Sequence, residues 1–258
     1  MRVLRLTLLG LVAYVLAVLW FFPAAPVVER FRPQLPQYVS LEDVSGRVLA
    51  GNIARARYTD DLLPLEFSDV GWRLKPLSII SGAALDVNFT GYGGGGEGNI
   101  LRKGNGDIAV SDVSVTAQAK ALEPLLPAPV ASFSGDLEMN VERLLLQEQL
   151  LKAFAGDFVW KAARLERPFP ANFGDVTINV KPADDNTNTH RALITASGGD
   201  VTAEGEIVIF LNGDFNADVL LTPTVTASQE LRDNLARIGR PDSSGRIRWV
   251  QQGNASQM

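Results

Sequence analysis

Two kinds of hydrophobic pattern divide the chain. Residues 6–28 run without a single charged side chain, and roughly 20 such residues suffice for a helix to cross a bilayer. From residue 41 onward, apolar and polar residues alternate in short stretches, which is typical of strands with one buried face. We therefore predict a mainly β protein: an N-terminal transmembrane helix, then a curved antiparallel β-sheet domain with a C-terminal amphipathic helix.

The charges around the apolar run predict its orientation. Arg2 and Arg5 precede it, which favours a cytoplasmic head and export of everything that follows. Pro23 and Pro26 are expected to end the helix near the membrane surface. A cleaved signal peptide is the alternative, but its apolar region usually runs only ~7–15 residues. The predicted parts are a head (1–5), a transmembrane helix (6–28), a proline-bearing connector (29–40), a periplasmic β domain (41–253) and a tail (254–258).

A Gly-Asp pair followed by alternating residues recurs through the β domain. Glycine accepts positive φ and aspartate bonds its own backbone, so each pair predicts a turn that opens a strand. The spacing between the pairs is irregular, whereas a solenoid repeats at a fixed period. We therefore expect a meander of unequal hairpins. The pairs lie at 106–107, 135–136, 156–157, 174–175, 199–200 and 213–214.

Further strands are predicted at 85–89, at 113–117 and at 246–250, the last with Ile247 and Trp249 facing inward. Residues 206–211 form a continuous apolar run that a strand buried on both faces would explain. Residues 143–154 fit either a short helix or strand segments, and the pattern leaves both open.

One helix is well specified, over residues 226–238. Thr226 precedes Gln229 by three positions, which is the spacing of a capping box. Leu231, Leu235 and Ile238 then form one apolar stripe. Gly239 and Pro241 follow directly and are expected to end the helix.

Composition removes several kinds of function. The chain has no cysteine and one histidine, so disulfides, thiolate zinc sites, cysteine nucleophiles and multi-histidine metal sites are excluded. Its formal charge of −5 argues against binding a nucleic-acid backbone. A hydrophobic fraction of 46% is enough for a packed core, which argues against disorder.

The candidate chemical sites have simpler structural explanations. Gly93–Gly98 match G-x-G-x-x-G, but no helix pattern follows as a dinucleotide site requires, so a hairpin loop is expected. Asp184 and Asp185 near His190 could bind a metal or exchange protons, yet their polar, turn-rich surroundings favour a solvated loop. Trp72 and Trp160 could stack on a ligand, but we expect both to pack in the core.

The glycosylation-type sequences at Asn88 and Asn254 are common chance matches. With no other candidate in the sequence, we expect no catalytic, cofactor-binding or metal-binding residues, no cofactor and no enzymatic activity.

Three stretches together resemble the type II secretion system protein N (GspN) family. The most specific is the C-terminal one, in which glycines, helix and turn residues agree in order and spacing. The Trp-Pro stretch alone also resembles proteins of the AsmA-like group. The three stretches are 41–51, with Gly46 and Gly51; 71–77, with Trp72 and Pro76; and 199–253.

The resemblance implies a single-pass inner-membrane protein of a Gram-negative bacterium with its bulk in the periplasm. It would be a non-catalytic component of the apparatus that exports folded proteins across the outer membrane. Its partners would be other inner-membrane secretion subunits and membrane lipids. The matched glycines, Trp72 and Pro76 would be fold markers. The AsmA-like similarity implies an alternative, a periplasmic protein that binds or transfers lipid.

Overall fold

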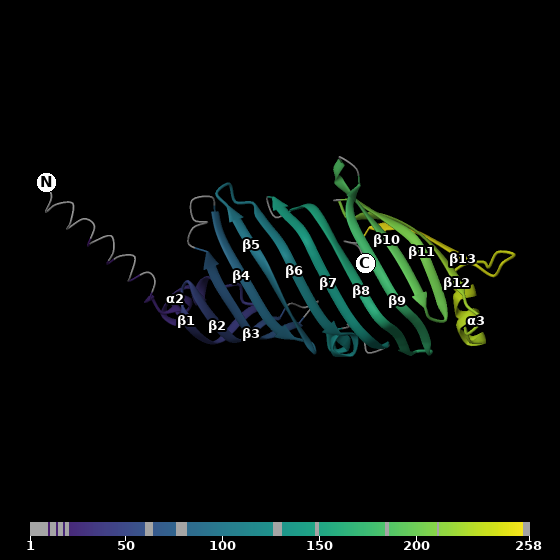
Figure 1. The fold of residues 1–258 in the computed structure, drawn as a ribbon, viewed down its shortest axis with the longest axis horizontal. Coiled ribbons are helices and arrows are strands. Elements are labelled where there is room, and N and C mark those ends of the chain that lie inside the picture. Colours follow the sequence, from purple (N-terminus) through teal and green to yellow (C-terminus); the bar gives the residue numbers. More distant parts are fainter. Residues whose placement is uncertain are drawn as a thin grey trace. The chain divides into compact units, whose positions relative to one another are not determined.

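The computed structural model describes residues 10, 14, 18, 21–59, 64–75, 82–125, 131–147, 150–183, 186–210 and 212–254. The chain forms two compact units, Met1–Gly91 and Tyr92–Met258. Strands dominate both units (Figure 1). The predicted mainly β, antiparallel fold is confirmed.

The first unit carries a short helical segment followed by four described strands in chain order, each antiparallel to its neighbour. The β1–β2 turn at Val48–Leu49 joins the first hairpin. The elements are α2 (Ala24–Phe31), η1 (Arg32–Gln34), β1 (Val39–Arg47), β2 (Ala50–Thr59), β3 (Pro64–Lys75) and β4 (Gly82–Gly91).

The second unit is a longer meander of antiparallel strands, again in chain order. Its elements are β5 (Gly94–Lys103), β6 (Ile108–Gln118), η3 (Ala119–Leu125), β7 (Ser132–Gln147), β8 (Leu150–Arg167), β9 (Ala171–Ala183), β10 (Asn186–Gly198), β11 (Val201–Phe210), β12 (Asp214–Pro223), α3 (Gln229–Ile238) and β13 (Ile247–Asn254). The predicted strands at 85–89 and 113–117 lie in β4 and β6, and the one at 246–250 lies in β13 except for Arg246. Residues 143–147 and 150–154 are strand, which excludes the helical alternative there.

Only half of the Gly-Asp pairs open a strand as predicted. Those that begin at Gly106, Gly199 and Gly213 lie in turns or bends, whereas the other three lie inside β7, β8 and β9. Gly135 and Gly174 have φ of +113° and +68° beside register shifts, so these glycines make bulges. At Gly156 a Cβ atom would lie 2.6 Å from the carbonyl oxygen of Asn140. Close strand approach, not a turn, explains glycine there.

The end of the apolar run contains a short helix that the sequence did not predict as a separate element. Pro23 is the N-cap of α2 and Pro26 lies in its first turn, where the amides that proline lacks have no partner within the helix anyway. Phe21 is helical and Phe22 is not, so Pro23 follows one helical segment and begins the next, and the expected connector at 29–40 starts with helical residues. Most of the predicted span at 6–28 falls outside the described residues. Among the described ones, no helix is long and apolar enough to cross a membrane.

One face of the second unit is apolar across eight strands. Register places one residue from each strand of β6–β13 in a single cross-strand row on this face. Most of these side chains are half-buried, and Met139 is 36% exposed. The row consists of Val115, Met139, Phe158, Ile178, Ile194, Gly205, Val219 and Trp249.

Helix α3 covers the C-terminal end of this apolar face. Leu231 and Leu235 pack with Ile247, Val201 and Ala171 in a buried cluster. Its cap differs from prediction: the Ser228 hydroxyl, not Thr226, accepts from the Leu231 amide. Ser228 lies two positions after Thr226, so it caps the helix by the same kind of hydrogen bond and the helix begins later.

Two predictions about buried side chains had opposite outcomes. Ile247 is 1% exposed and Trp249 is half-buried, so their inward orientation in β13 is confirmed. By contrast, Ile209 and Phe210 are 36% and 37% exposed, so the run at 206–211 is not buried on both faces. Residue 211 itself lies outside the described part.

Candidate interaction surface

His190 lies in a strand and not in the solvated loop that the sequence predicts. It is 4% exposed in β10, and its Nε2 accepts a hydrogen bond of 2.9 Å from the Phe154 amide of β8. The register pairs His190 with Pro182 of β9, and the β8–β9 pairing ends at Gly156↔Val180, before it reaches Phe154. The imidazole thus satisfies an amide where the ladder ends.

This environment gives His190 a structural role. Burial lowers the pKa of its imidazole, so the ring stays neutral and keeps Nε2 available as an acceptor. Asp184 and Asp185, its proposed partners in metal or proton chemistry, lie outside the described residues.

Trp72 and the two glycines of the first stretch form one packing unit. Gly46 and Gly51 face each other in the β1–β2 hairpin, and Gly51 also pairs with Trp72 of β3. A Cβ atom on Gly51 would lie 2.4 Å from the indole ring, so glycine is required for the tryptophan to cover the hairpin. The indole Nε1 donates to the Val48 carbonyl at 3.0 Å. Trp72 thus packs beneath a turn, half-buried, as a structural side chain.

Trp160 of β8 is also structural. Its Nε1 donates to the Ser134 carbonyl at 3.0 Å, and its ring makes an edge contact with Phe133. Within Gly93–Gly98, Gly93 is in a turn and the remainder belongs to β5, so most of this stretch is strand and not the predicted hairpin loop. Pro76 lies outside the described residues.

The two glycosylation-type asparagines lie in strands. Asn88 is exposed in β4. Asn254 ends β13, where its side chain donates to Asp214 Oδ1 at 2.7 Å.

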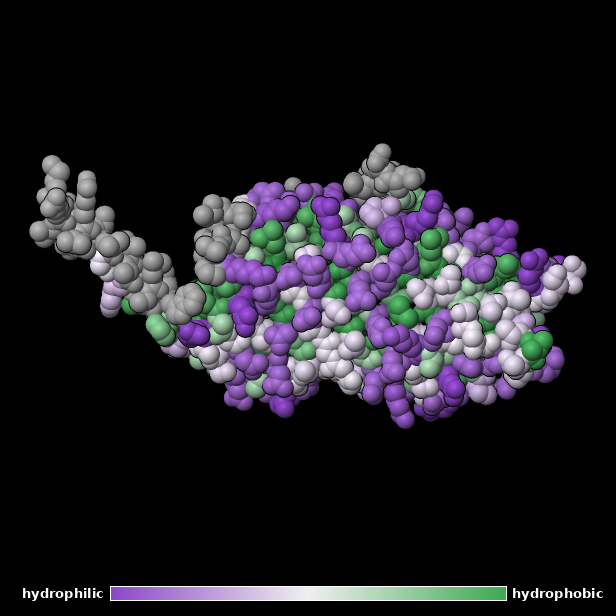
Figure 2. Space-filling view, viewed as in Figure 1, coloured by the Kyte–Doolittle hydropathy of each residue, from purple (hydrophilic) through white to green (hydrophobic). Residues whose placement is uncertain are grey.

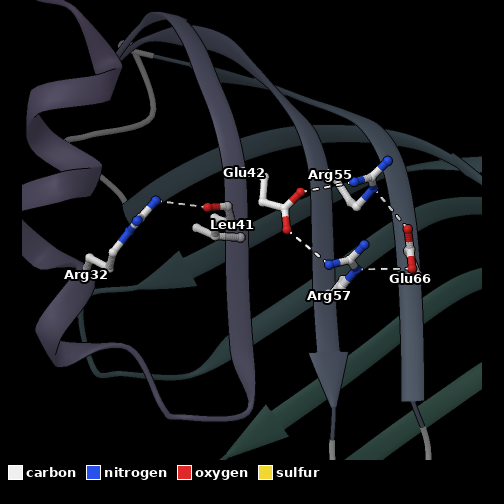
Figure 3. Close-up of polar contacts among 6 residues, drawn as sticks. All are labelled: Arg32, Leu41, Glu42, Arg55, Arg57 and Glu66. Atoms are coloured by element: carbon white, nitrogen blue, oxygen red, sulfur yellow. Dashed lines mark hydrogen bonds and ion pairs between the residues drawn. The ribbon is translucent and has the colours of Figure 1, made fainter.

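A closed network of ion pairs lies on one face of β1–β3, and the sequence analysis missed it (Figure 3). Arg55 and Arg57 each contact both Glu42 and Glu66, at 3.0–3.1 Å. Every charge therefore has two opposite partners. The only sequence signal is Arg-Ala-Arg alternation in a strand, which places both arginines on one face.

The polar face of the C-terminal strands is different, because apolar side chains interrupt it. Register forms a second row, next to the apolar one but on the opposite face, which is polar except for two residues. Leu193 and Val250 are 48% and 60% exposed. The row consists of Ser114, Asn140, Asp157, Asn179, Leu193, Glu206, Asp218 and Val250.

Both exposed apolar residues line a groove of 1080 Å³ over β10–β13 and the loop that follows α3. Leu220 and Val208 add to its apolar floor, and Arg240 lies on the loop side. In the view of Figure 2, hydrophobic residues likewise come to the surface between hydrophilic ones over the strands. Fifteen residues line this groove in all, and we call it the C-terminal groove.

Separate ion pairs occupy the C-terminal groove. Arg248 pairs with Asp218, and Arg246 pairs with Asp242 at 2.9 Å. The hydrogen bond from Arg248 lowers the pKa of Asp218, and backbone and side-chain donors of Arg246 lower the pKa of Asp242. These carboxylates are therefore charged at neutral pH.

A hydrogen-bond network holds the end of the sheet where the chain leads into α3. Asp200 accepts from the Asn172 amide at 3.1 Å and from the Thr226 hydroxyl at 2.8 Å. Its own carbonyl accepts from the Thr224 amide at 2.8 Å. The Gly199-Asp200 turn thus ties β9 to the segment that leads into α3.

In the described part of the chain, no three His, Asp or Glu side chains gather in a way that would hold a metal ion. The described surface has a groove, paired charges and exposed apolar residues. Such a surface is suited to binding another molecule.

A family model for type II secretion system protein N matches residues 37–250. That range spans both β units and ends in β13. The chain belongs to the type II secretion system protein N family.

Curated relatives in the family match over most of their length. The chain is similar to type II secretion system protein N of Vibrio cholerae serotype O1, with 26% identity over 85% of this chain and 86% of the relative. It is similar to the Aeromonas hydrophila protein of the same name, with 25% identity over 95% and 96%. No solved structure matches the chain. These matches do not show the further AsmA-like similarity.

Proposed function

We propose that this chain is a non-catalytic inner-membrane component of the type II secretion apparatus. Residues 6–28 anchor it, the β units stand in the periplasm, and their surfaces bind other inner-membrane secretion subunits. The family match over 37–250 carries this proposal, because it covers the β strands, the C-terminal helix and most of the C-terminal groove.

The structure supports a binding role in its second unit. The C-terminal groove combines exposed Leu193 and Val250 with charged side chains, and α3 holds its strands from the opposite face. Isolated exposed apolar residues are ordinary, but here two of them face one groove. The half-buried Trp72 and Trp160 are already engaged with their own turns and strands.

Deletion of the gene tests the role in secretion. We expect secreted substrates to accumulate in the periplasm and the full-length chain to restore their release. Normal release from the deletion strain, with every other subunit present, would contradict the proposal.

The anchor needs its own experiment. Protease added to spheroplasts should digest residues 29–258 and leave a small membrane-held N-terminal fragment. Digestion only after membrane lysis would show the opposite orientation. A mature protein that lacks the first 25 residues would show a cleaved signal.

The apolar face of the second unit favours a second candidate, binding of lipid acyl chains. Its cross-strand row includes Met139 and Phe158 and reaches Trp249, and beyond α3 its side chains are only half-buried. Mass spectrometry of the purified periplasmic part, isolated in detergent, should then find copurified lipid. If no lipid copurifies, the apolar face serves only the protein's own packing, as the first proposal requires.

A further inference from the structure

The first and last strands, β1 and β13, differ in how far other parts of the chain cover their outer edges. At β1 the chain covers its own edge: the Val48 amide donates to the Phe22 carbonyl at 3.0 Å, and Pro23 bridges to Arg47. Arg32 reaches from η1 to the Leu41 carbonyl at 3.0 Å (Figure 3). Exposed strand edges are templates for pairing, and covering them prevents it.

At β13 only the first residues are covered. Pro241 bridges to Ile247, and the Asp242 amide donates to the Arg246 carbonyl at 2.8 Å. Among the described residues, no strand pairs with β13 on the side away from β12. The edge therefore stays open at Val250 and Gln252.

The hydrogen bond between this loop and Arg246 also shows which backbone groups of β13 face away from β12. The Arg246 carbonyl points away from β12, because it accepts from the loop. Amides and carbonyls of alternate residues share one side of an antiparallel strand, and the β12–β13 register runs without a shift. The free amides and carbonyls are thus those of Val250 and Gln252.

The side chains at this edge suggest what would pair with it. Val250 presents an apolar surface, 60% exposed, on the groove side. Arg240, Arg246 and Arg248 line the same side near the start of β13, beside Asp218 and Asp242, whereas the groove's other two carboxylates, Glu204 and Glu206, lie on β11, two strands from the edge. An added strand would extend the rows of the groove, with an apolar residue beside Val250 and an acidic one beside the arginines.

We propose that the open edge of β13 takes up an extended segment of another secretion subunit as an additional strand, with an acidic and an apolar side chain facing the C-terminal groove. This inference rests on the proposed function, because it takes the partner from the secretion apparatus. Backbone hydrogen bonds would supply affinity, and Val250 and the arginines would supply specificity.

Photocrosslinking in cells that make the full chain and all secretion subunits tests the edge directly. A photoreactive amino acid at position 250 should give an adduct with an extended segment of another subunit, and one at Ser40 on the covered strand should not. Mass spectrometry of the adduct identifies the segment. Equal adducts from both positions would overturn the proposal, as would an adduct only with lipid or with a second copy of this chain.

A matched pair of substitutions tests the backbone contribution. Gln252→Pro removes an outward amide, whereas Gln252→Ala keeps it and removes the side chain. We expect the proline variant to reduce crosslinking from position 250 about tenfold, which equals about 1.4 kcal/mol, and the alanine variant to resemble the wild type. Crosslinking by the folded proline variant at wild-type yield would contradict the proposal. Should Gln252→Pro not fold, the position-250 adduct decides alone.

The two proposals fail in different ways. If the deletion strain secretes normally, the proposed function is wrong. If deletion blocks secretion while the folded Gln252→Pro variant secretes and crosslinks like the wild type, only the β13 edge is wrong.

Discussion

The hairpin region at 39–75 and the C-terminal region at 186–254 contain similar charged residues but arrange them differently. Both place arginines and carboxylates on one face of antiparallel strands. In the hairpin region, Arg55, Arg57 and their two glutamates close on themselves. In the C-terminal region, the pairs stand apart and leave Leu193 and Val250 exposed between them.

The support beneath each surface differs as well. Trp72 covers the hairpin through Gly51, so a single aromatic ring does the packing. The C-terminal strands instead rest on α3 through Leu231 and Ile247. A surface whose charges already satisfy one another has little to offer a partner, whereas one with separate pairs and bare apolar residues does. This difference supports the proposal that the C-terminal end is the part that binds a partner.

Removing the support beneath the C-terminal strands should have the largest effect. Leu231 is 2% exposed at the centre of the buried cluster. Leu231→Ala should lower the free energy of unfolding by about 2–5 kcal/mol, because it deletes buried methyl groups and leaves a cavity. Urea denaturation of a purified chain that lacks residues 1–28 measures the loss.

Ile238→Ala is the matched control in the same helix. Ile238 is 53% exposed, so its truncation should change stability by less than about 0.5 kcal/mol. Equal losses from both variants would mean that α3 does not hold the strands through its buried stripe.

The alternation of residues predicted much of this architecture, since period 2 and the stripe of Leu231 and Leu235 depend on local sequence alone. His190 was misjudged because its polar neighbours at 184–189 outweighed a strand signal that follows it. His190, Ala192, Ile194 and Ala196 alternate inward in β10. The sequence-based interpretation stopped at the loop residues and so separated His190 from its strand.

The groove lay beyond sequence reasoning for a different reason. It depends on which residues of different strands meet, and bulges decide that register. Asp218 faces both Glu206 and Val250 only because of the pairings of β11–β13. In the same way, nothing in the sequence pairs Gly51 with Trp72, which lies 21 positions later. The resemblance singled out Gly46, Gly51 and Trp72 separately, and only the register shows that they pack on one another.

The hairpin region should break at its tightest contact. Gly51→Ala places a Cβ atom 2.4 Å from the Trp72 ring and 2.5 Å from the Ser45 carbonyl oxygen. We expect a loss of up to about 3 kcal/mol, since overpacking forces backbone and ring to move. Thermal unfolding checks this. Gly104→Ala is the control, because nothing lies within 4 Å of a Cβ atom there, and it should leave the unfolding midpoint almost unchanged. If both variants shift the midpoint equally, the contact with Trp72 is not the cause of the loss.

His190 should make the C-terminal region sensitive to pH. Burial lowers its folded pKa below the ordinary 6.5, so the unfolded chain binds the proton more tightly. The free energy of unfolding therefore falls as pH drops below about 6.5 and levels off once the folded pKa is passed. The chain has no other histidine.

His190→Gln should remove that dependence. The amide oxygen can still accept from Phe154, so we expect a loss of about 1 kcal/mol at pH 8 and a flat profile between pH 5 and 7. Urea denaturation across this range gives both values. A variant that keeps the wild-type slope would mean that another group titrates.

The smallest effect should come from the pair at the edge of the groove. Arg248 lowers the pKa of Asp218 from its ordinary 3.8, so this stabilisation is complete above about pH 3.8 and is lost as pH falls through the lowered folded pKa. Arg248→Gln should return the pKa of Asp218 toward 3.8, as carboxyl carbon NMR titration would record. Global stability should hardly change, because exposed pairs contribute little.

Arg246→Gln is its control. It should raise the pKa of Asp242 only slightly, because the backbone donors of Arg246 and Ser244 remain, and it should leave the pKa of Asp218 unaffected, because Arg248 still pairs with it. In the hairpin region, by contrast, Arg57→Gln leaves Arg55 in contact with both glutamates. If Arg246→Gln shifts the pKa of Asp218 as far as Arg248→Gln does, the C-terminal charges are a network too. The distinction that assigns binding to the C-terminal region would then rest on Leu193 and Val250 alone.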